Sequence, residues 1–301
     1  MKFIKITSFL VLGQLMGLQS LEAETTYERR FPIEGHQRLT INQEHLRAFT
    51  LGISLFPVST TIKSYNGSEL LVRASERTTL GFKNPLEIAF EETEGELSIS
   101  MAFRHKWSFG IWMGNMEIEL LVPSGWEGRM DLEMLKSRTV IKDLVISEIN
   151  GNTSITELTI ERSRFERTTF NLGTDTDFSI YNTDLGECRI RGKLGKIDGE
   201  KIRGSIDAET LDGNICIGFD KLEGSTRLKS KLGEIRVGVP EDTSAEIDLR
   251  SRLSSVKCDV NLTSSSEIGT KRIAGSIGES DTENSLVLHS GDGKIHLQYR
   301  N

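Results

Sequence analysis

The sequence predicts an all-β protein that contains a parallel β-solenoid, and three observations carry this prediction. From about residue 140 onward, short motifs of apolar residue, glycine, polar residue and apolar residue recur, as in 194–197 and 232–235. Apolar and polar residues alternate beside these motifs, which is typical of strands with one buried face. No segment after residue 23 has the apolar spacing of an amphipathic helix.

Two interleaved series of anchor positions define the repeat. Both advance in the same steps of 18, 20, 21, 21 and 18 residues, which indicates a coil that holds two short strands. One coil cannot bury its own apolar face, so successive coils are expected to stack in parallel, with glycines at corners that need positive φ. The alternative is a set of antiparallel hairpins with accidental spacing. The series are Ile197, Ile215, Ile235, Val256, Ile277 and Ile295, and Cys188, Ile206, Thr226, Ile247, Ile268 and Leu286.

Outward positions of this solenoid carry charges of alternating sign. Arg189, Asp207, Arg227 and Asp248 each follow an anchor of the second series by one residue. Neighbouring strands lie about 4.8 Å apart, so a stack in chain order would place opposite charges side by side. The same stack predicts that Cys188 and Cys258 point inward, too far apart for a disulfide, and that Cys216 points outward.

Residues 1–23 are predicted to be a secretory signal peptide. Lys2 and Lys5 precede a mostly apolar run at 6–18, and Ala23 offers a small residue before the cleavage point. The run is too short to span a bilayer as a helix, and no second one follows, so we expect no transmembrane segment in the mature chain. The protein is expected to be exported and to be periplasmic, cell-surface or secreted; the alternative is an uncleaved anchor.

The mature chain is expected to have two regions. Residues 24–127 show alternating strands and turn signals at Asn66-Gly67 and 93–95, which predict an antiparallel β region that caps the solenoid. Residues 128–301 form the β-solenoid repeat region. Asn66-Gly67 is predicted to close a hairpin between 60–64 and 70–74.

In these motifs the chain resembles the bacterial "putative adhesin" β-strand-repeat family, a domain of unknown function. The resemblance rests on Val-Pro-Ser-Gly at 122–125, Leu-Gly-Glu-Ile-Arg-Val at 232–237, Ala-Glu-Ile-Asp-Leu at 245–249 and the closing segment 286–295. It covers most of residues 24–301. It implies a β-solenoid at the cell envelope or outside the cell, and it supplies no catalytic or binding residues.

The residues point to binding rather than catalysis. The net charge of −7 argues against a nucleic-acid partner. A glycan-active β-helix enzyme would need converging carboxylates, yet acids alternate with bases in the outward columns. The five histidines lack zinc-like spacing, so we expect no metal, no cofactor and no catalytic residue. The predicted function is an adhesin or binding protein of the envelope; the alternative is a structural or sensory protein that binds a partner protein of its own cell.

Two segments are candidate binding surfaces. The aromatic stretch 103–113 contains Trp107, Phe109 and Trp112 and is either an exposed tip or a plug over the solenoid end. The stretch 189–203 carries six bases against two acids and is either a patch for polyanions or a solvated face. Envelope glycans, host glycans, other polyanions and a protein remain open as partners. The six bases are Arg189, Arg191, Lys193, Lys196, Lys201 and Arg203.

Overall fold

The computed structural model describes residues 7–8, 23–33, 37–45, 49–51, 54–55, 58–80, 86–103, 107–109, 112–135, 137–154, 157–279 and 282–300. Every regular element in these ranges is a β-strand, which confirms the all-β class. Among them, none forms a helix with the length and hydropathy needed to cross a membrane. The expected signal peptide lies outside the described residues except for Thr7–Ser8 and Ala23. The chain divides into two compact units, unit 1 (Met1–Leu144) and unit 2 (Val145–Asn301).

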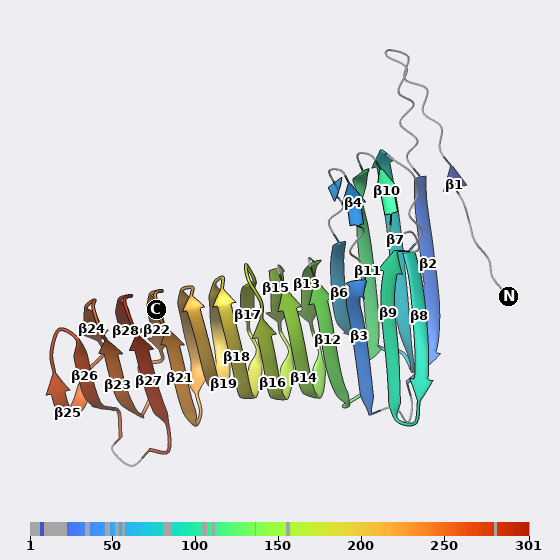
Figure 1. Cartoon of the computed structure of the whole chain (residues 1–301). Helices are drawn as coiled ribbons and strands as arrows, with labels where there is room; N and C mark the ends of the chain where they lie inside the picture. Colours follow the sequence, from blue (N-terminus) through green and yellow to red (C-terminus); the bar gives the residue numbers. More distant parts are fainter. Residues whose placement is uncertain are drawn as a thin grey trace. The chain divides into compact units, whose positions relative to one another are not determined.

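Unit 1 is a β-structure with both kinds of strand pairing (Figure 1). β7 pairs antiparallel with β2 and β11, and β8 and β9 form an antiparallel hairpin. β6 pairs in parallel with β11 and β13, and β3 pairs in parallel with β9 and β12. The strands are β1 (Thr7–Ser8), β2 (Ala23–Pro32), β3 (Arg38–His45), β4 (Phe49–Leu51), β5 (Ser54–Leu55), β6 (Val58–Tyr65), β7 (Glu69–Leu80), β8 (Leu86–Thr93), β9 (Glu96–Phe103), β10 (Trp107–Phe109), β11 (Trp112–Pro123), β12 (Arg129–Leu135) and β13 (Ser137–Lys142).

Two details of unit 1 differ from the expectation for residues 24–127. Parallel pairing already begins in this region, so it is mixed rather than antiparallel. Asn66-Gly67 links β6 to β7 but closes no hairpin, because β11 pairs with both strands and lies between them. Among the described residues, the glycines with positive φ include Gly95 of the β8–β9 turn, with a φ of 79°, but not Gly67. The turn at 93–95 is confirmed.

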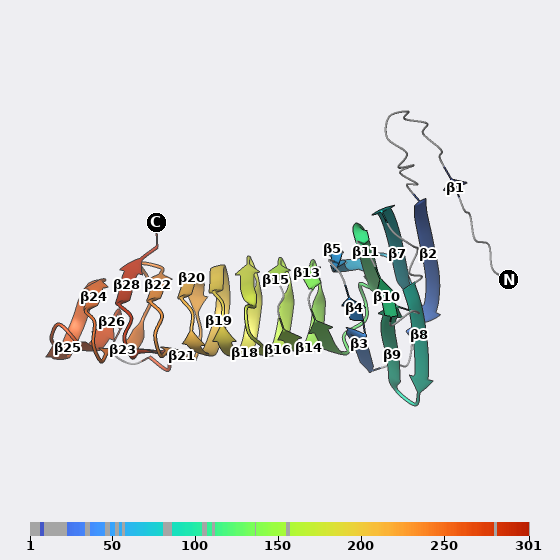
Figure 2. The same cartoon turned by 45° about the horizontal axis from the view of Figure 1, so that its top comes forward.

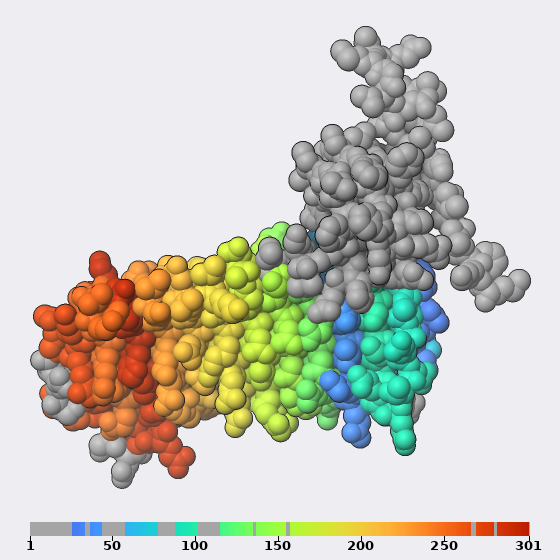
Figure 3. Space-filling view, in the orientation of Figure 1, coloured from blue at the N-terminus to red at the C-terminus, as the bar shows by residue number. Residues whose placement is uncertain are grey.

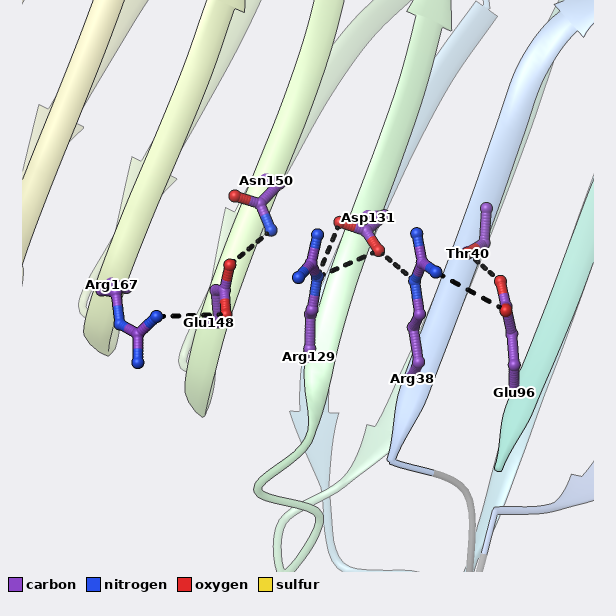
Figure 4. A network of polar contacts seen from close by, with 8 residues as sticks. All are labelled: Arg38, Thr40, Glu96, Arg129, Asp131, Glu148, Asn150 and Arg167. Carbon is purple, nitrogen blue, oxygen red and sulfur yellow. Dashed lines mark hydrogen bonds and ion pairs between the residues drawn. The ribbon is translucent and has the colours of Figure 1, made fainter. Parts of the chain in front are cut away.

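A row of charges crosses three strands of unit 1 (Figure 4). Arg38 on β3 and Arg129 on β12 are register neighbours, which brings two like charges together. Asp131 accepts a hydrogen bond from the Nε of each guanidinium. Arg38 Nη1 also lies 3.6 Å from Glu96 Oε2 on β9. Acids beside each arginine thus offset the repulsion that this parallel register would create.

Unit 2 is a parallel β-solenoid in which each coil gives one strand to each of two stacks (Figure 2). The first stack begins β14–β16–β18–β19–β21, and the second begins β15–β17–β19–β20–β22. β19 belongs to both because it continues around a corner. The strands are β14 (Val145–Ser154), β15 (Glu157–Glu161), β16 (Arg164–Leu172), β17 (Asp177–Tyr181), β18 (Asp184–Leu194), β19 (Ile197–Asp212), β20 (Ile215–Leu222), β21 (Ser225–Ser230), β22 (Ile235–Val239), β23 (Ala245–Ser251), β24 (Val256–Asp259), β25 (Leu262–Ile268), β26 (Arg272–Ile277), β27 (Ser285–Ser290) and β28 (Ile295–Tyr299).

The repeat periods correspond to the observed register as far as β22. Ile197 pairs with Ile215, and Ile215 with Ile235. All three side chains are buried in the core between the stacks. The expected two-strand coil is confirmed here.

The last coils do not stack in chain order. β27 pairs in parallel with β21 on one side and with β23 on the other. β28 lies in the same way between β22 and β24. The C-terminal coil is therefore inserted between two coils that are consecutive in the sequence, as Figure 1 shows. In the first anchor series, Ile235 is followed in the stack by Ile295 and then by Val256. The expected order, in which Val256 follows Ile235 directly, is therefore wrong.

An antiparallel hairpin follows β23. β26 pairs antiparallel with β23, and β25 pairs antiparallel with β26. Ile277 and Ile268, assigned to the two anchor series by their spacing, lie in this hairpin and are not parallel register partners of the other anchors. β23 is paired on both edges, in parallel with β27 and antiparallel with β26, so no further parallel strand can add to it.

The three cysteines are free. Cys188 is buried, as expected, and burial raises the pKa of its thiol to about 12. Cys258 aligns with the inward-facing Leu297 but is only half-buried, because β24 ends its stack and pairs with β28 alone among the described strands. Burial also raises the pKa of Cys216, which does not favour a thiolate there.

Candidate binding surface on unit 2

One corner of the solenoid repeats a Ser-x-x-Gly turn in successive coils. Ser230 Oγ accepts a hydrogen bond from Gly233 N at 2.8 Å and donates one to Gly213 O of the neighbouring coil at 3.0 Å. Ser290 repeats both contacts with Gly293 N and Gly233 O, at 2.9 and 3.1 Å. The buried serines thus close the turn within a coil and join it to the next coil. Thr210 holds the same position one coil earlier, but its buried Oγ1 has no hydrogen-bond partner among the described residues.

The corner glycines are required chiefly by close approach between coils. A Cβ on Gly233 would lie 2.0 Å from Gly213 O, and one on Gly293 would lie 2.0 Å from Gly233 O. Of the glycines in this column, Gly195 alone has a positive φ, of 109°. The expectation that positive φ explains these corners is therefore corrected: the neighbouring carbonyl leaves no room for a side chain.

The outer face of the first stack carries the expected alternation of charge up to β21. Arg189 pairs with Asp207, and Asp207 with Arg227. Arg189 Nε lies 3.8 Å from Asp207 Oδ2. Beyond β21 the alternation ends, because Val287 of the inserted β27 stands between Arg227 and Asp248.

Earlier coils show the same alternation. Glu148, Arg167 and Glu187 follow each other in register on β14, β16 and β18. Arg167 Nη1 lies 4.0 Å from Glu148 Oε2, and Asn150 donates a hydrogen bond to Glu148 (Figure 4). Figure 3 shows these coils as parallel ridges along the face that it draws. Carboxylates on this surface thus lie next to basic or amide groups rather than converging on one point.

The six bases of 189–203 do not form one patch, because the segment winds around the solenoid. Four of them have carboxylate partners within 4.0 Å. Lys193 and Lys201 are exposed, and Lys201 occupies a corner with a φ of 56°. The pairs are Arg189 with Asp207, Arg191 with Asp207 and Glu209, Lys196 with Asp198, and Arg203 with Asp220. Binding by these residues stays a prediction.

The aromatic stretch is described only through its backbone. β10 pairs in parallel with β4, with Trp107 opposite Phe49 and Phe109 opposite Leu51. Trp112 begins β11 opposite Ser54 of β5. The side chains of Trp107, Phe109 and Trp112 lie outside the described residues, so the choice between exposed tip and plug stays a prediction.

A groove of about 500 Å³ crosses the coils beside the Ser-x-x-Gly corner. It brings together residues from β18, β19, β21 and β27, which are consecutive in the stack although far apart in the chain. Its floor holds small residues and its rim is mainly basic. The lining residues are Arg191, Gly192, Glu209, Thr210, Leu211, Lys229, Ser230, Lys231, His289, Ser290 and Gly291.

The groove has an excess of positive charge. Arg191 is held by Asp207, with Nη2 at 2.6 Å from Oδ2. Lys229 and Lys231 have no carboxylate within 4.0 Å in the part of the chain that the structure describes. Glu209 is the acidic residue of the lining, and its Oε2 lies 3.9 Å from Arg191 Nε.

His289 lies between charged neighbours on both flanking strands. Burial lowers the pKa of His289 and outweighs the opposing charge of Asp248. The cations Arg227, Lys229 and Arg250 lower this pKa further. Its Nε2 has no hydrogen-bond partner among the described residues and lies 3.9 Å from Asp248 Oδ2.

Sequence reasoning missed the groove. Of its basic residues, Arg191 alone was among the six candidate bases. The recurring Ser-x-x-Gly turn at 230–233 and 290–293 could have marked the corner, but the contact of β21 with β27 depends on the inserted C-terminal coil. Within the described residues, no group of three His, Cys, Asp or Glu side chains is placed to hold a metal ion.

The structural relatives of the chain are distant. A "putative cell adhesion protein" from Clostridium sporogenes is 11% identical with a TM-score of 0.31, over 92% of this chain and 100% of its own. A "putative adhesin" from Parabacteroides merdae is 8% identical with a TM-score of 0.38, over 90% of this chain and 95% of its own. At these values the likeness carries no argument about function. No curated protein has significant sequence similarity to the chain. The model of the Toastrack family DUF4097 matches residues 37–296, and the chain therefore belongs to this family.

Proposed function

We propose that this chain is an exported, non-enzymatic binding protein of the bacterial cell envelope. The observation that carries the proposal is the outer face of the unit 2 solenoid, where short strands repeat at one spacing and present ion-paired charges. Such a surface is suited to many weak contacts with an extended partner. The partner is an envelope or host glycan, another polyanion or a protein.

The arrangement of the carboxylates supports binding over hydrolysis. Glycan hydrolysis by acid–base chemistry needs two carboxyl groups that face one bond, with their pKa values separated. Asp207, in the middle of the outer column, lies within 4.0 Å of both Arg189 and Arg191. Two guanidinium groups already occupy this carboxylate, which makes it a partner in the ion-paired column of the outer face.

Export has a direct test. The full-length chain, expressed in a bacterial host, is expected to leave the cytoplasm and to begin at Glu24, because Ala23 precedes the predicted cleavage point. Cell fractionation and N-terminal sequencing of the mature protein provide the measurement. A cytoplasmic protein that keeps Met1 would contradict the proposed location.

Binding is tested with the mature protein against purified cell wall, lipopolysaccharide, mucin, matrix proteins and intact host cells, each at low and moderate salt. Saturable binding to host material supports adhesion, and binding only to envelope material of the same cell supports the structural or sensory role. A Trp107→Ala/Trp112→Ala variant tests the aromatic stretch. Absence of saturable binding to every material would overturn the proposal.

A further inference from the structure

We propose that the groove beside the Ser-x-x-Gly corner binds the anionic groups of an acidic glycan chain. This assignment rests on the proposed binding function and names the site and the chemistry of its ligand. The lining comes from four consecutive strands of the stack, so the groove follows the solenoid axis over about 14 Å. A chain molecule laid along that axis would meet residues from each coil in turn.

The charges of the groove fit an anion. Lys229 lies on β21 and Lys231 in the corner that follows it, and neither has a carboxylate within 4.0 Å in the described chain. Arg191 stands two strands away in the same outward column as Lys229, about 10 Å distant. Cations at these separations match a polymer that carries a negative group on successive units.

Two unpartnered polar groups give an independent sign of a ligand. Thr210 is 3% exposed, lines the groove and has an Oγ1 with no hydrogen-bond partner in the described chain. His289 also lines the groove, and its Nε2 is unpartnered in the same sense. Buried polar atoms normally have partners, and a polyhydroxylated ligand in the groove could provide them. The Oγ1 atoms of Thr153, Thr168 and Thr176 elsewhere in unit 2 also lack a partner within the described ranges, and Thr210 and His289 are the two such residues that line the groove.

The shape of the groove favours a sugar chain over other anions. Its floor consists of the small residues Gly192, Ser230, Ser290 and Gly291, which leave room for a ring; the hydroxyl groups of both serines are bonded within the corner. Leu211 supplies an apolar wall and is 47% exposed. A flat lipid surface would not enter this hollow, and nucleic acid would find no Phe, Tyr or Trp side chain in the lining on which to stack a base.

Protonation of His289 is expected to be coupled to binding. The charged groups that face it are Arg227 and Lys229 on β21 and Asp248 and Arg250 on β23, with Arg272 of β26 at 3.4 Å from Asp248. An anion in the groove offsets the cations among them and favours the protonated ring. Binding should therefore take up a proton and strengthen as the pH falls through the range in which His289 titrates.

The test uses the mature protein and three probes of similar length: oligogalacturonate, a heparin oligosaccharide and neutral maltohexaose. Isothermal titration calorimetry at low salt is expected to detect the acidic probes and not the neutral one. The two acidic arms distinguish a carboxylate ligand from a sulfated one. Lys229→Gln/Lys231→Gln should weaken binding about tenfold or more. The control Lys271→Gln/Lys294→Gln removes the same charge from exposed lysines outside the groove and should change affinity less than about twofold.

A second variant separates the groove from general electrostatics. Thr210→Val removes the unpartnered hydroxyl at nearly constant volume, so it should raise the melting temperature of the free protein and weaken binding of the acidic probe. His289→Gln should remove the proton uptake, which calorimetry in buffers of different ionisation enthalpy reports. Equal losses in the two lysine pairs, or binding that Thr210→Val leaves unchanged, would overturn the site.

Failure of the groove and failure of the proposed function are distinguishable. If the wild-type protein binds neither acidic probe, the groove assignment is overturned, while saturable binding to envelope or host material would still support the broader function.

Discussion

The buried corner serines of unit 2 show how one side chain can specify both a turn and the stacking of coils. Ser251 Oγ accepts a hydrogen bond from Ser254 N at 3.1 Å and donates one to Gly293 O at 2.9 Å. The first bond closes the corner and the second joins it to the next coil. Replacing the hydroxyl leaves a backbone donor and a backbone acceptor without this partner in a buried site, which costs more than an ordinary hydrogen bond contributes.

Ser251→Ala is therefore expected to lower the free energy of unfolding by about 1–3 kcal/mol. Urea unfolding of the mature protein provides the measurement. Ser255→Ala is the matched control, because Ser255 is exposed at the same corner, and its effect should stay within about 0.5 kcal/mol. Equal effects of the two substitutions would show that the corner hydroxyls are dispensable.

The corner glycines lead to a second prediction about single residues. In Gly233→Ala the new Cβ would meet Gly213 O at 2.0 Å, and a backbone carbonyl in a stacked strand cannot move aside at low cost. We expect a loss on the order of 3 kcal/mol or more in unfolding free energy. In Gly218→Ala the nearest atom would lie at 3.7 Å, so this control should be neutral or stabilising by about 0.4–1 kcal/mol. Thermal melts of both variants decide whether coil contact requires glycine at the corner.

At the scale of elements, the inserted C-terminal coil is the feature with the largest consequence. β27 and β28 each pair on both edges, with β21 and β23 and with β22 and β24. A terminal strand usually leaves one edge unpaired and open to aggregation. Here the chain end is covered on both sides, and β23, β26 and β25 form the end of the first stack.

Cysteine pairs can test the insertion directly. Arg227 and Val287 are register partners, about 4.8 Å apart, which suits a disulfide. Arg227 and Asp248 are separated by β27 and lie about 9.6 Å apart, too far to be bridged. In a Cys216→Ser/Cys258→Ser background, we expect Arg227→Cys/Val287→Cys to form an intramolecular disulfide and Arg227→Cys/Asp248→Cys to form none. Mass spectrometry of non-reduced peptides distinguishes the pairs, and the opposite result would support stacking in chain order.

The sequence could reveal the coil but not the order of the last coils. Register between 188–200 and 206–218 follows from local alternation and glycine placement, so periodicity predicted it correctly. The corners at 230–235, 251–256 and 290–295 share one pattern of serine and apolar anchor, and any of them can stack on another. Which pair makes contact is decided by the loops and by the hairpin of β25 and β26, and this information is not contained in the spacing.

The candidate site was harder to predict for a related reason. A cluster of bases in the sequence is a cluster in space only if the segment is straight, and 189–203 turns two corners. The groove instead joins Arg191, Lys229 and His289, which become neighbours only through stacking. Periodicity could place each of them on an outward column, but their meeting depended on the inserted β27.

At the scale of the whole molecule, stability is expected to depend on carboxylates in both units. In unit 1, Glu28 and Glu119 flank Arg73 on neighbouring strands, at 3.1 and 3.4 Å. The hydrogen bond from Arg73 lowers the pKa of Glu28; for Glu119, burial acts in the opposite direction but is outweighed by Lys63 and Arg73. In unit 2, burial alone would raise the pKa of Asp248, but Arg250 and Arg272 lower it.

These lowered pKa values predict the direction of acid unfolding. A carboxylate with a lower pKa in the folded state stabilises the fold above its unfolded pKa, 4.5 for Glu and 3.8 for Asp, and this stability is lost as the pH falls through the folded value. These groups should therefore leave the melting temperature nearly constant above about pH 5. At pH values below about 4.5 the melting temperature should decrease. Arg73→Gln should lower it at neutral pH, and the difference should shrink as the pH falls through the folded-state pKa values of Glu28 and Glu119. Lys294→Gln removes an exposed charge with no ion pair in the described chain, so its effect should not depend on pH in this way. Calorimetric melts of the three proteins across this range make the comparison, and a deficit in Arg73→Gln that persists undiminished in acid would assign the role of Arg73 to packing instead of charge.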